Sequence, residues 1–234
     1  QDSLDKGGYQ TYKEAQLPLI PVLARMQVTG IALDVGVLRD MSKELGKQIR
    51  SHEREIFDDV GHEFNIHSPQ QLSSVLFEEL GLRKTKRTRT GSHSTDAAAL
   101  EGLRSGELAP AHRRIIDNLL AIRHESKLKS TYIDALPSLV DTSSGRLHTN
   151  YNLAGSATGR LASSDPNLMN IPIRTEQGRR VRRAFKAGPP EWLLLAADYS
   201  QIELRILAHL SKDLALTASF ERDEDIHATT ASHM

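Results

Sequence analysis

Apolar residues recur at helical spacing through the first half of the chain. One such stripe runs from Leu38 to Val60 and is followed by Gly61. Glycine readily adopts the left-handed conformation that closes many helices, so Gly61 fits a C-cap. The pattern therefore predicts a long amphipathic helix over residues 38–60.

Further helices are predicted over residues 68–80, 95–103 and 112–133. Ser68 and Gln71 have the spacing of a capping box, and Gly81 follows as a stop. Thr95 is placed to cap the short helix after it. The polar segment 83–95 has no apolar face, so we expect an exposed, mobile tip on a helical arm that reaches toward a charged partner.

The pattern changes after the last of these helices. Residues 141–145 read DTSSG, which is typical of a turn, and Leu147, Thr149 and Tyr151 then alternate as in a strand. Residues 154–172 are rich in Gly, Ser, Thr, Asn and Pro. We expect an irregular segment there, whose shape is set by side-chain hydrogen bonds.

Near the end of the chain, an apolar run stops at a single carboxylate. Residues 192–197 (WLLLAA) predict a buried strand, and Asp198 follows it directly. Ser200 and Glu203 then have capping-box spacing, which predicts a helix. Its apolar stripe consists of Ile202, Ile206, Leu207 and Leu210. Asp198 is thus expected beside a helix N-terminus, where it could meet a metal or phosphate, although such an Asp also serves as a cap or turn residue.

Composition narrows the class of protein. With 234 residues, 38% of them hydrophobic, the chain can bury a core as one large domain or two smaller ones. No run approaches the roughly 18 apolar residues of a membrane span, and the N-terminus lacks the order of a signal peptide. There is no cysteine, which excludes disulfides and thiolate metal sites and suits an intracellular protein.

The net charge of zero conceals two oppositely charged parts. Residues 82–186 hold 19 Lys and Arg against 9 Asp and Glu, so the remainder holds 11 against 21. Basic residues cluster at 83–89 and again at 174–186. Such surfaces suit a polyphosphate partner, because each neutralised phosphate releases counterions. Two solvated loops would account for the same clusters.

Two long motifs resemble the polymerase domain of family A DNA polymerases, the bacterial DNA polymerase I type. They are SATGRLASSDPNLMNIPIRTEQGRRVRRAF at 156–185 and LLLAADYSQIELRILAHLS at 193–211. Shorter segments agree, among them FNIHSPQQLSSVLFEELGL and KLKSTYIDALP, so the resemblance covers nearly the whole chain.

The resemblance implies an α+β fold of the right-hand polymerase architecture, with a helical thumb and a partial antiparallel-sheet palm, truncated before most of the fingers. The implied parts are an N-terminal palm segment (1–36), the thumb (37–140, basic tip near 83–95), the palm with the first catalytic motif (141–224) and the start of the fingers (225–234).

The implied activity is template-directed addition of deoxynucleotides to a primer 3′ end, with two Mg²⁺ ions in the complete enzyme. Asp198 then matches a catalytic, metal-binding carboxylate and the carbonyl of Tyr199 a backbone ligand. Glu203 matches the residue that excludes ribonucleotides, and as a capping residue it would be rigid. His227 matches a residue near the incoming nucleotide; a surface or capping role is its alternative.

Four residues match positions that touch the minor groove of the primer–template. Arg160, Asn167 and Asn170 could donate to the acceptors that every Watson–Crick pair presents there. Position 169 departs from the family, which usually has Gln, because Met169 has no hydrogen-bond donor. The alternative is that these polar residues organise a turn.

Further matches imply contacts with the DNA backbone, which position the duplex without reading its sequence. The residues are Lys86, Arg87, Arg89, Ser94, Thr95, Lys127, Lys129 and Arg179. The arginines of 179–183 could equally form salt bridges with the acidic part of the chain.

The implied partners are primer–template DNA and deoxynucleoside triphosphates, without a membrane, in the bacterial cytoplasm, a phage-infected cell or an organelle. The fingers helix and the second palm carboxylate are not among the 234 residues, nor is a nuclease domain. We therefore expect weak DNA binding and no polymerisation by this chain alone. We expect it to be an incomplete sequence, an engineered fragment or one half of a split enzyme completed by a second chain. A non-catalytic DNA-binding module is the alternative; Glu203 and the QIE string disfavour an RNA polymerase.

Overall fold

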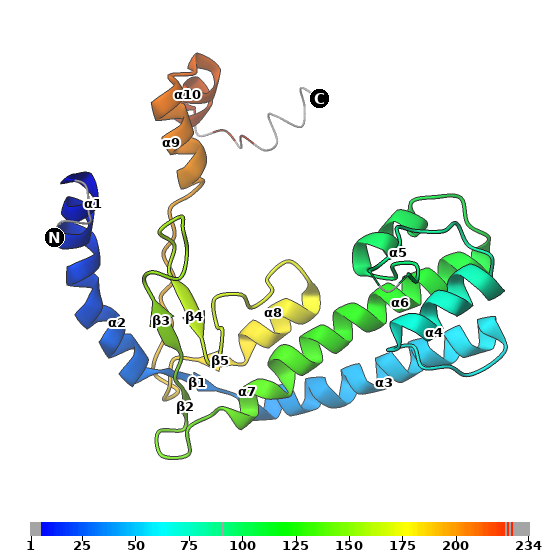
Figure 1. The fold of residues 1–234 in the computed structure, drawn as a ribbon. Helices are drawn as coiled ribbons and strands as arrows, with labels where there is room; N and C mark the ends of the chain where they lie inside the picture. Colours follow the sequence, from blue (N-terminus) through cyan, green and yellow to red (C-terminus); the bar gives the residue numbers. More distant parts are fainter. Residues whose placement is uncertain (1–5, 90, 223, 225, 227–234) are drawn as a thin grey trace. The chain divides into compact units, whose positions relative to one another are not determined.

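The computed structural model describes residues 6–89, 91–222, 224 and 226 (Figure 1). Over these residues the chain is mostly helical, with two small antiparallel sheets, in agreement with the predicted mixture of helix and sheet. The chain divides into two units, Gln1–Trp192 and Leu193–Met234.

The α-helices are α1 (Lys6–Thr11), α2 (Leu17–Thr29), α3 (Val35–Val60), α4 (Pro69–Ser74), α5 (Ala97–Arg104), α6 (Pro110–Leu128), α7 (Ala135–Ser138), α8 (Glu176–Arg183), α9 (Ile202–Ser211) and α10 (Leu214–Glu221). Three π-helical turns continue or join them: η1 (Tyr12–Gln16), η2 (Val75–Glu79) and η3 (Lys129–Ile133). The strands are β1 (Ile31–Leu33), β2 (Arg146–Leu147), β3 (Asn150–Asn152), β4 (Ala162–Ser164) and β5 (Phe185–Lys186).

Helices α3 and α6 lie side by side and form a long arm (Figure 1). As predicted, α3 carries one buried stripe and ends at Gly61, whose φ is 90°. It begins earlier than predicted because the Asp34 carboxylate accepts a hydrogen bond from the Val37 amide, at 3.2 Å. Lys186, at 2.6 Å, and this amide hold the pKa of Asp34 below its usual range.

Two hydrophobic clusters follow each other along the arm. The tip core is made of Ile56, Ile66, Leu72, Leu76, Phe77, Leu82, Leu100, Leu103, Ile115, Ile116, Leu119 and Ile122. The base core is made of Leu38, Met41, Leu45, Leu128, Ile133, Leu136, Leu147, Val181 and Ala184. The end of α3 therefore packs on the start of α6 and vice versa, so the two helices are antiparallel.

The base core rests on a three-stranded antiparallel sheet in the order β2-β1-β5. Ile31 pairs with Leu147 and Ala32 with Lys186, so strands far apart in sequence meet on β1. The Arg146 guanidinium fastens this sheet, because it donates to the carbonyls of Thr29, Gly30 and Ala187 at 2.8, 3.2 and 3.1 Å.

The strand predicted over residues 147–151 is interrupted. Thr149 lies between β2 and β3, with its hydroxyl donating to the carbonyls of Ser164 and Pro166 at 3.1 and 2.7 Å. β3 then pairs with β4 instead, with Tyr151 opposite Ser163. The segment 154–172 is irregular as predicted, apart from β4.

Two predicted helix starts need correction. The Ser68 hydroxyl accepts from the Gln71 amide at 3.4 Å, but Gln71 Oε1 accepts from the Asn65 amide, so the capping box is closed on one side only. Thr95 does not cap α5. The cap is Asp96, whose carboxylate accepts from the Ala99 amide at 2.7 Å.

The buried strand predicted over residues 192–197 is wrong. The segment is irregular, and Leu193 and Leu195 are 91% and 95% exposed, because no described strand pairs with it. The helix α9 follows as predicted, but its N-cap is Gln201, without a side-chain capping bond, rather than Ser200. Its apolar stripe is exposed at Ile206 and Leu210.

Several elements were not predicted at all: α1, α2, β1, α7, α8, β5 and α10. Helices α1 and α2 join through η1 into one helical stretch in which Leu23 is buried while Ile20 and Met26 are exposed. None of the helices in the described part of the chain combines the length and apolar character needed to span a bilayer.

Candidate nucleic-acid interface

The basic segment 83–95 forms a hydrogen-bonded hairpin beside the tip core. Arg87 and His93 make a β-bridge, and the Ser94 amide donates to the Lys86 carbonyl at 2.8 Å. The expected exposed tip is therefore present, but with defined strand-like pairing in its described residues. Lys86, Arg87 and Arg89 are exposed on it.

The hairpin is anchored by its own polar side chains. His93 Nδ1 donates to the Thr85 carbonyl at 2.7 Å, and its ring meets Phe77 edge-on, with centroids 5.2 Å apart. The Ser94 hydroxyl donates to Asp96 at 2.8 Å. Thr95 is only 5% exposed, so the expected contact between its side chain and DNA is not available in this structure.

Lys127 and Lys129, both expected at phosphate, differ in their surroundings. Lys127 is exposed on α6. The Lys129 ammonium lies 2.5 Å from Asp134, whose other oxygen accepts from the Ser42 hydroxyl at 2.7 Å. Burial works to raise the pKa of Asp134, but these two partners outweigh it and lower the pKa. Asp134, at the end of η3, thus pairs with Lys129 at its start and bonds to Ser42 of α3.

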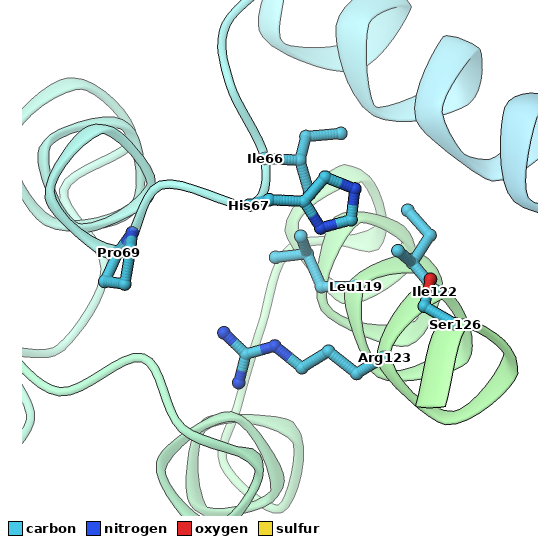
Figure 2. Close-up of a pocket in the computed structure, with 7 residues that line it drawn as sticks. All are labelled: Ile66, His67, Pro69, Leu119, Ile122, Arg123 and Ser126. Atoms are coloured by element: carbon cyan, nitrogen blue, oxygen red, sulfur yellow. The ribbon is translucent and has the colours of Figure 1, made fainter. Parts of the chain in front are cut away.

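A cavity of about 210 Å³ opens between α6 and the segment before α4 (Figure 2). Arg123, His67 and Ser126 supply its polar groups. The remaining lining is apolar and consists of Ile66, Pro69, Leu119 and Ile122. Burial lowers the pKa of Arg123, while the charge of Asp96 acts in the opposite sense. Figure 2 shows the Arg123 guanidinium pointing away from Ser126. A partly desolvated guanidinium at such a cavity suits a phosphate group.

The sequence did not predict this cavity, because it is assembled from two segments at least fifty residues apart in the chain. One signal was present. Arg123 precedes Lys127 by four residues, so a helix places both on one face.

The arginine cluster of α8 is largely paired within the protein. Arg180 forms two hydrogen bonds with Glu44 of α3, at 3.0 and 2.7 Å, and lowers the pKa of that carboxyl. Arg179 donates to Glu176 at 2.9 Å and to the Arg174 carbonyl at 3.1 Å. Arg180 therefore forms the expected salt bridge with the acidic part of the chain, whereas Arg179 pairs with Glu176 inside the basic part, and half of its side chain remains exposed.

The loop after β4 holds three of the expected minor-groove residues. Asn167 Oδ1 accepts from the Ser163 hydroxyl at 3.2 Å and from the Met169 amide at 3.1 Å. Its oxygen is thus used inside the turn, which leaves the exposed amide group of Asn167 as a donor. Met169 is 51% exposed and adds an apolar surface beside it.

Asn170 joins this loop to the arm, because its carbonyl accepts a hydrogen bond from the Tyr132 hydroxyl at 2.6 Å. Burial raises the pKa of Tyr132. The Asn170 side chain is exposed, as is Arg160 before β4. Asn167 thus organises the turn, as the alternative had it, and its amide group remains exposed; contact with the minor groove stays a prediction.

Asp198, Tyr199 and Glu203 belong to the second unit. Asp198 and Tyr199 are exposed in the irregular segment before α9, and Glu203 lies in the first turn of that helix. Among the described residues, no group of three or more His, Asp or Glu side chains is placed to hold a metal ion. Mg²⁺ commonly takes one or two protein carboxylates and completes its shell with water and phosphate, so Asp198 and the Tyr199 carbonyl fit part of such a site. His227 lies outside the described residues.

Three features indicate a chain related to enzymes that act on nucleic acid. They are the loop after β4, the basic hairpin 83–95 and the motif that contains Asp198. The description "DNA polymerase family A" matches residues 35–234. The chain therefore belongs to DNA polymerase family A.

Two curated relatives indicate which type of family A polymerase the chain is similar to. It is 53% identical over 224 residues to "DNA polymerase I, thermostable" of Thermus aquaticus, covering 95% of this chain and 26% of the relative. It is 46% identical to DNA polymerase I of Bacillus subtilis, covering 95% and 24%. The chain thus corresponds to a polymerase-domain fragment and spans about a quarter of the length of the curated relatives it matches.

A solved structure agrees. The POL domain of Pol1 from M. smegmatis, in complex with DNA primer–template and dNTP, has a TM-score of 0.83 and 42% sequence identity. The match covers 97% of this chain and 39% of that one.

Proposed function

We propose that this chain is the thumb and first part of the palm of a template-directed DNA polymerase that adds deoxynucleotides to a primer 3′ end. The observation that carries the proposal is the likeness, over almost the whole chain, to a polymerase domain bound to primer–template DNA and dNTP. The thumb is residues 37–140, flanked by palm residues 1–36 and 141–224, with the fingers beginning at 225.

In this proposal the arm holds the DNA backbone. Lys86, Arg87 and Arg89 on the hairpin and Lys127 on α6 present exposed positive charge. We add Arg123 as a phosphate contact, supported by its partial burial and by its place in the lining of the cavity. These contacts position the duplex without selecting a sequence.

Arg160, Asn167 and Asn170 meet the minor groove at the primer terminus. The support is the Asn167 amide, which its own turn leaves outward as a donor to the acceptors shared by all Watson–Crick pairs. Met169 offers no such donor. We therefore expect Met169→Gln to change mismatch extension in the complete enzyme; unchanged extension would contradict this role.

Asp198 and the Tyr199 carbonyl hold Mg²⁺ together with groups from the rest of the polymerase domain. Two such ions, when bound, supply the charge that activates the primer hydroxyl and neutralises the leaving pyrophosphate. Glu203, at the start of α9, crowds the sugar 2′ position. Glu203→Ala in the complete enzyme should raise ribonucleotide incorporation, and unchanged sugar selectivity would argue against this.

DNA binding by this chain is testable directly. Duplex affinity, measured by fluorescence anisotropy over a salt series, should fall steeply with salt, with a slope of about −0.9 per phosphate contacted. Lys86→Gln and Arg123→Gln should weaken binding, while Lys13→Gln, at an exposed lysine of η1, should not. Salt-insensitive binding, or equal losses in all three variants, would overturn the proposed interface.

A split or fragmentary polymerase is favoured over a purely DNA-binding module by the exposed apolar surface around the carboxylate motif. Such a surface suits completion by further polypeptide. Mixing this chain with one that carries the remainder of a polymerase domain should give primer extension that Asp198→Asn abolishes. Extension that persists in the Asp198→Asn mixture would exclude the catalytic role of Asp198.

A further inference from the structure

A polar seam crosses the arm between its two hydrophobic cores. On α3, His52 lies between Leu45 of the base core and Ile56 of the tip core. On α6, Glu125 lies between Ile122 and Leu128, which belong to the same two cores. Glu125 is only 7% exposed, so a carboxyl group is buried at the point where the cores meet.

The hydrogen bonds of Asn118 determine which nitrogen of His52 carries a proton. Asn118 Nδ2 donates to Glu55 at 3.0 Å, since a carboxylate only accepts. Asn118 Oδ1 therefore faces His52, and His52 Nδ1 must donate to it at 2.9 Å. In a neutral imidazole the other nitrogen, Nε2, is then a bare acceptor.

His52 Nε2 points at an acceptor as well, because Glu125 Oε1 lies 3.7 Å away. If both groups were deprotonated, two acceptors would face each other in a buried place, which is unfavourable. The seam also contains two buried acceptor oxygens without a hydrogen-bond partner among the described residues, Glu125 Oε2 and Gln48 Oε1, the latter one turn before His52 on α3. With both groups deprotonated, the seam therefore lacks a proton that could be donated to these acceptors.

We propose that the Glu125 carboxyl carries a proton that it directs at His52 Nε2, and that this proton locks the seam, so that the arm loosens as the pH rises. When protonated, the carboxyl offers a donor to the bare acceptor of the imidazole. Loss of the proton leaves a buried carboxylate facing a lone pair. The device concerns the arm itself and does not depend on polymerase activity.

The charged surroundings of Glu125 come from both helices. His52 faces it from α3, His124 adjoins it on α6, and Glu55 reaches the network through Asn118. Further charged groups nearby are Arg123 and His67, which line the cavity beside Ser126. Burial raises the pKa of Glu125 in spite of the two histidines that act against it. A raised folded-state pKa gives stability that is present at low pH and lost as the pH rises through that pKa.

The test is thermal unfolding of the full 234-residue chain, followed by circular dichroism between about pH 4.5 and 8. Glu125→Gln keeps a hydrogen-bond donor toward His52 but cannot titrate. The Tm of the unmodified chain should fall with pH relative to this variant, by about 2–4 °C for each 1 kcal/mol lost. Glu101→Gln, at an exposed glutamate of α5, should leave the pH profile unchanged.

A second variant keeps the test decisive if Glu125→Gln folds poorly. His52→Leu with Glu125→Leu replaces the seam by apolar contacts, and its Tm should show the same flattened pH profile as Glu125→Gln. Hydrogen exchange should show the loss of protection concentrated in α3 and α6 of the unmodified chain. Parallel pH profiles for the unmodified chain and both variants would overturn the proposal.

Discussion

The arm formed by α3 and α6 and the stretch from Leu193 through α9 contain the same kinds of apolar residue, but only the arm buries them. Leu119 of α6 is 1% exposed, whereas Leu195 is 95% exposed. The arm has two helices whose stripes face each other. Residues 193–197 pair with no described strand, and α9 packs on the short helix α10 with Ile206 and Leu210 still exposed. An apolar pattern thus predicts which side chains favour burial. They are buried only where another element of the protein packs against them.

The largest difference between the two regions is expected when one leucine is removed from each. Leu119→Ala should destabilise the chain by about 2–5 kcal/mol, because it leaves a cavity in the tip core. Leu195→Ala should change stability by less than about 0.5 kcal/mol. Urea unfolding of the two variants provides the measurement. Similar losses in both would mean that residues 193–197 are buried in solution.

A glycine pair tests packing at the base of the arm. A Cβ at Gly178 of α8 would lie 2.7 Å from the Pro172 carbonyl oxygen and 2.8 Å from its Cβ, so Gly178→Ala should destabilise by about 1–3 kcal/mol. At Gly102 of α5 a Cβ meets nothing within 4 Å. Gly102→Ala should therefore stabilise by about 0.5–1 kcal/mol. Opposite signs in chemical denaturation are expected, and equal signs would contradict the close approach.

The contrast between a capped and an uncapped helix predicts a smaller effect. Asp96 caps α5, and the Ala99 amide lowers the pKa of its carboxyl, whereas α9 has no side-chain cap. Asp96→Ala should cost about 1 kcal/mol in urea unfolding. Asp58→Ala, at an exposed position inside α3, is the control and should cost nothing. An equally harmless Asp96→Ala would mean that the cap does not stabilise α5.

The smallest effect is expected at the turn before β2. The Ser143 hydroxyl and the Ser144 amide lower the pKa of Asp141 from 3.8 to about 2. Its contribution to stability is thus present above pH 3.8 and lost as the pH falls toward 2. Asp141→Asn keeps an acceptor and should weaken the acid dependence of Tm over this range, while Asp58→Asn should not. An unchanged acid limb in Asp141→Asn would rule this out.

The long helices could be predicted because each carries a stripe that its sequence repeats over many turns. Strand β1 could not, since three residues give no periodicity, and its pairing with β2 and β5 depends on segments far away in the chain. Helix α8 escaped notice because only Val181 and Ala184 of its region enter the base core. The error at residues 192–197 came from equating an apolar run with a buried one.

For the candidate site, the sequence supplied residue types and the structure supplied their neighbours. The exposed basic residues of the hairpin were predicted from charge alone. The pairing of Arg180 with Glu44 of α3 and the cavity at Arg123 depend on contacts between segments remote in sequence, which no local pattern encodes. Asn167 is an intermediate case. Its side-chain oxygen is used by the local turn, which a sequence pattern can predict, and its amide group is left as a donor.

The guanidinium of Arg146 bears on the order in which the chain acquires its structure. It donates hydrogen bonds to the carbonyls of Thr29, Gly30 and Ala187. Strand β1 pairs with residues more than a hundred positions downstream. Contacts local in sequence form sooner than distant ones. During synthesis, therefore, the arm should be folded before β1 has a sheet to join, and pulse-labelled hydrogen exchange on refolding should protect α3 and α6 ahead of Ile31 and Ala32.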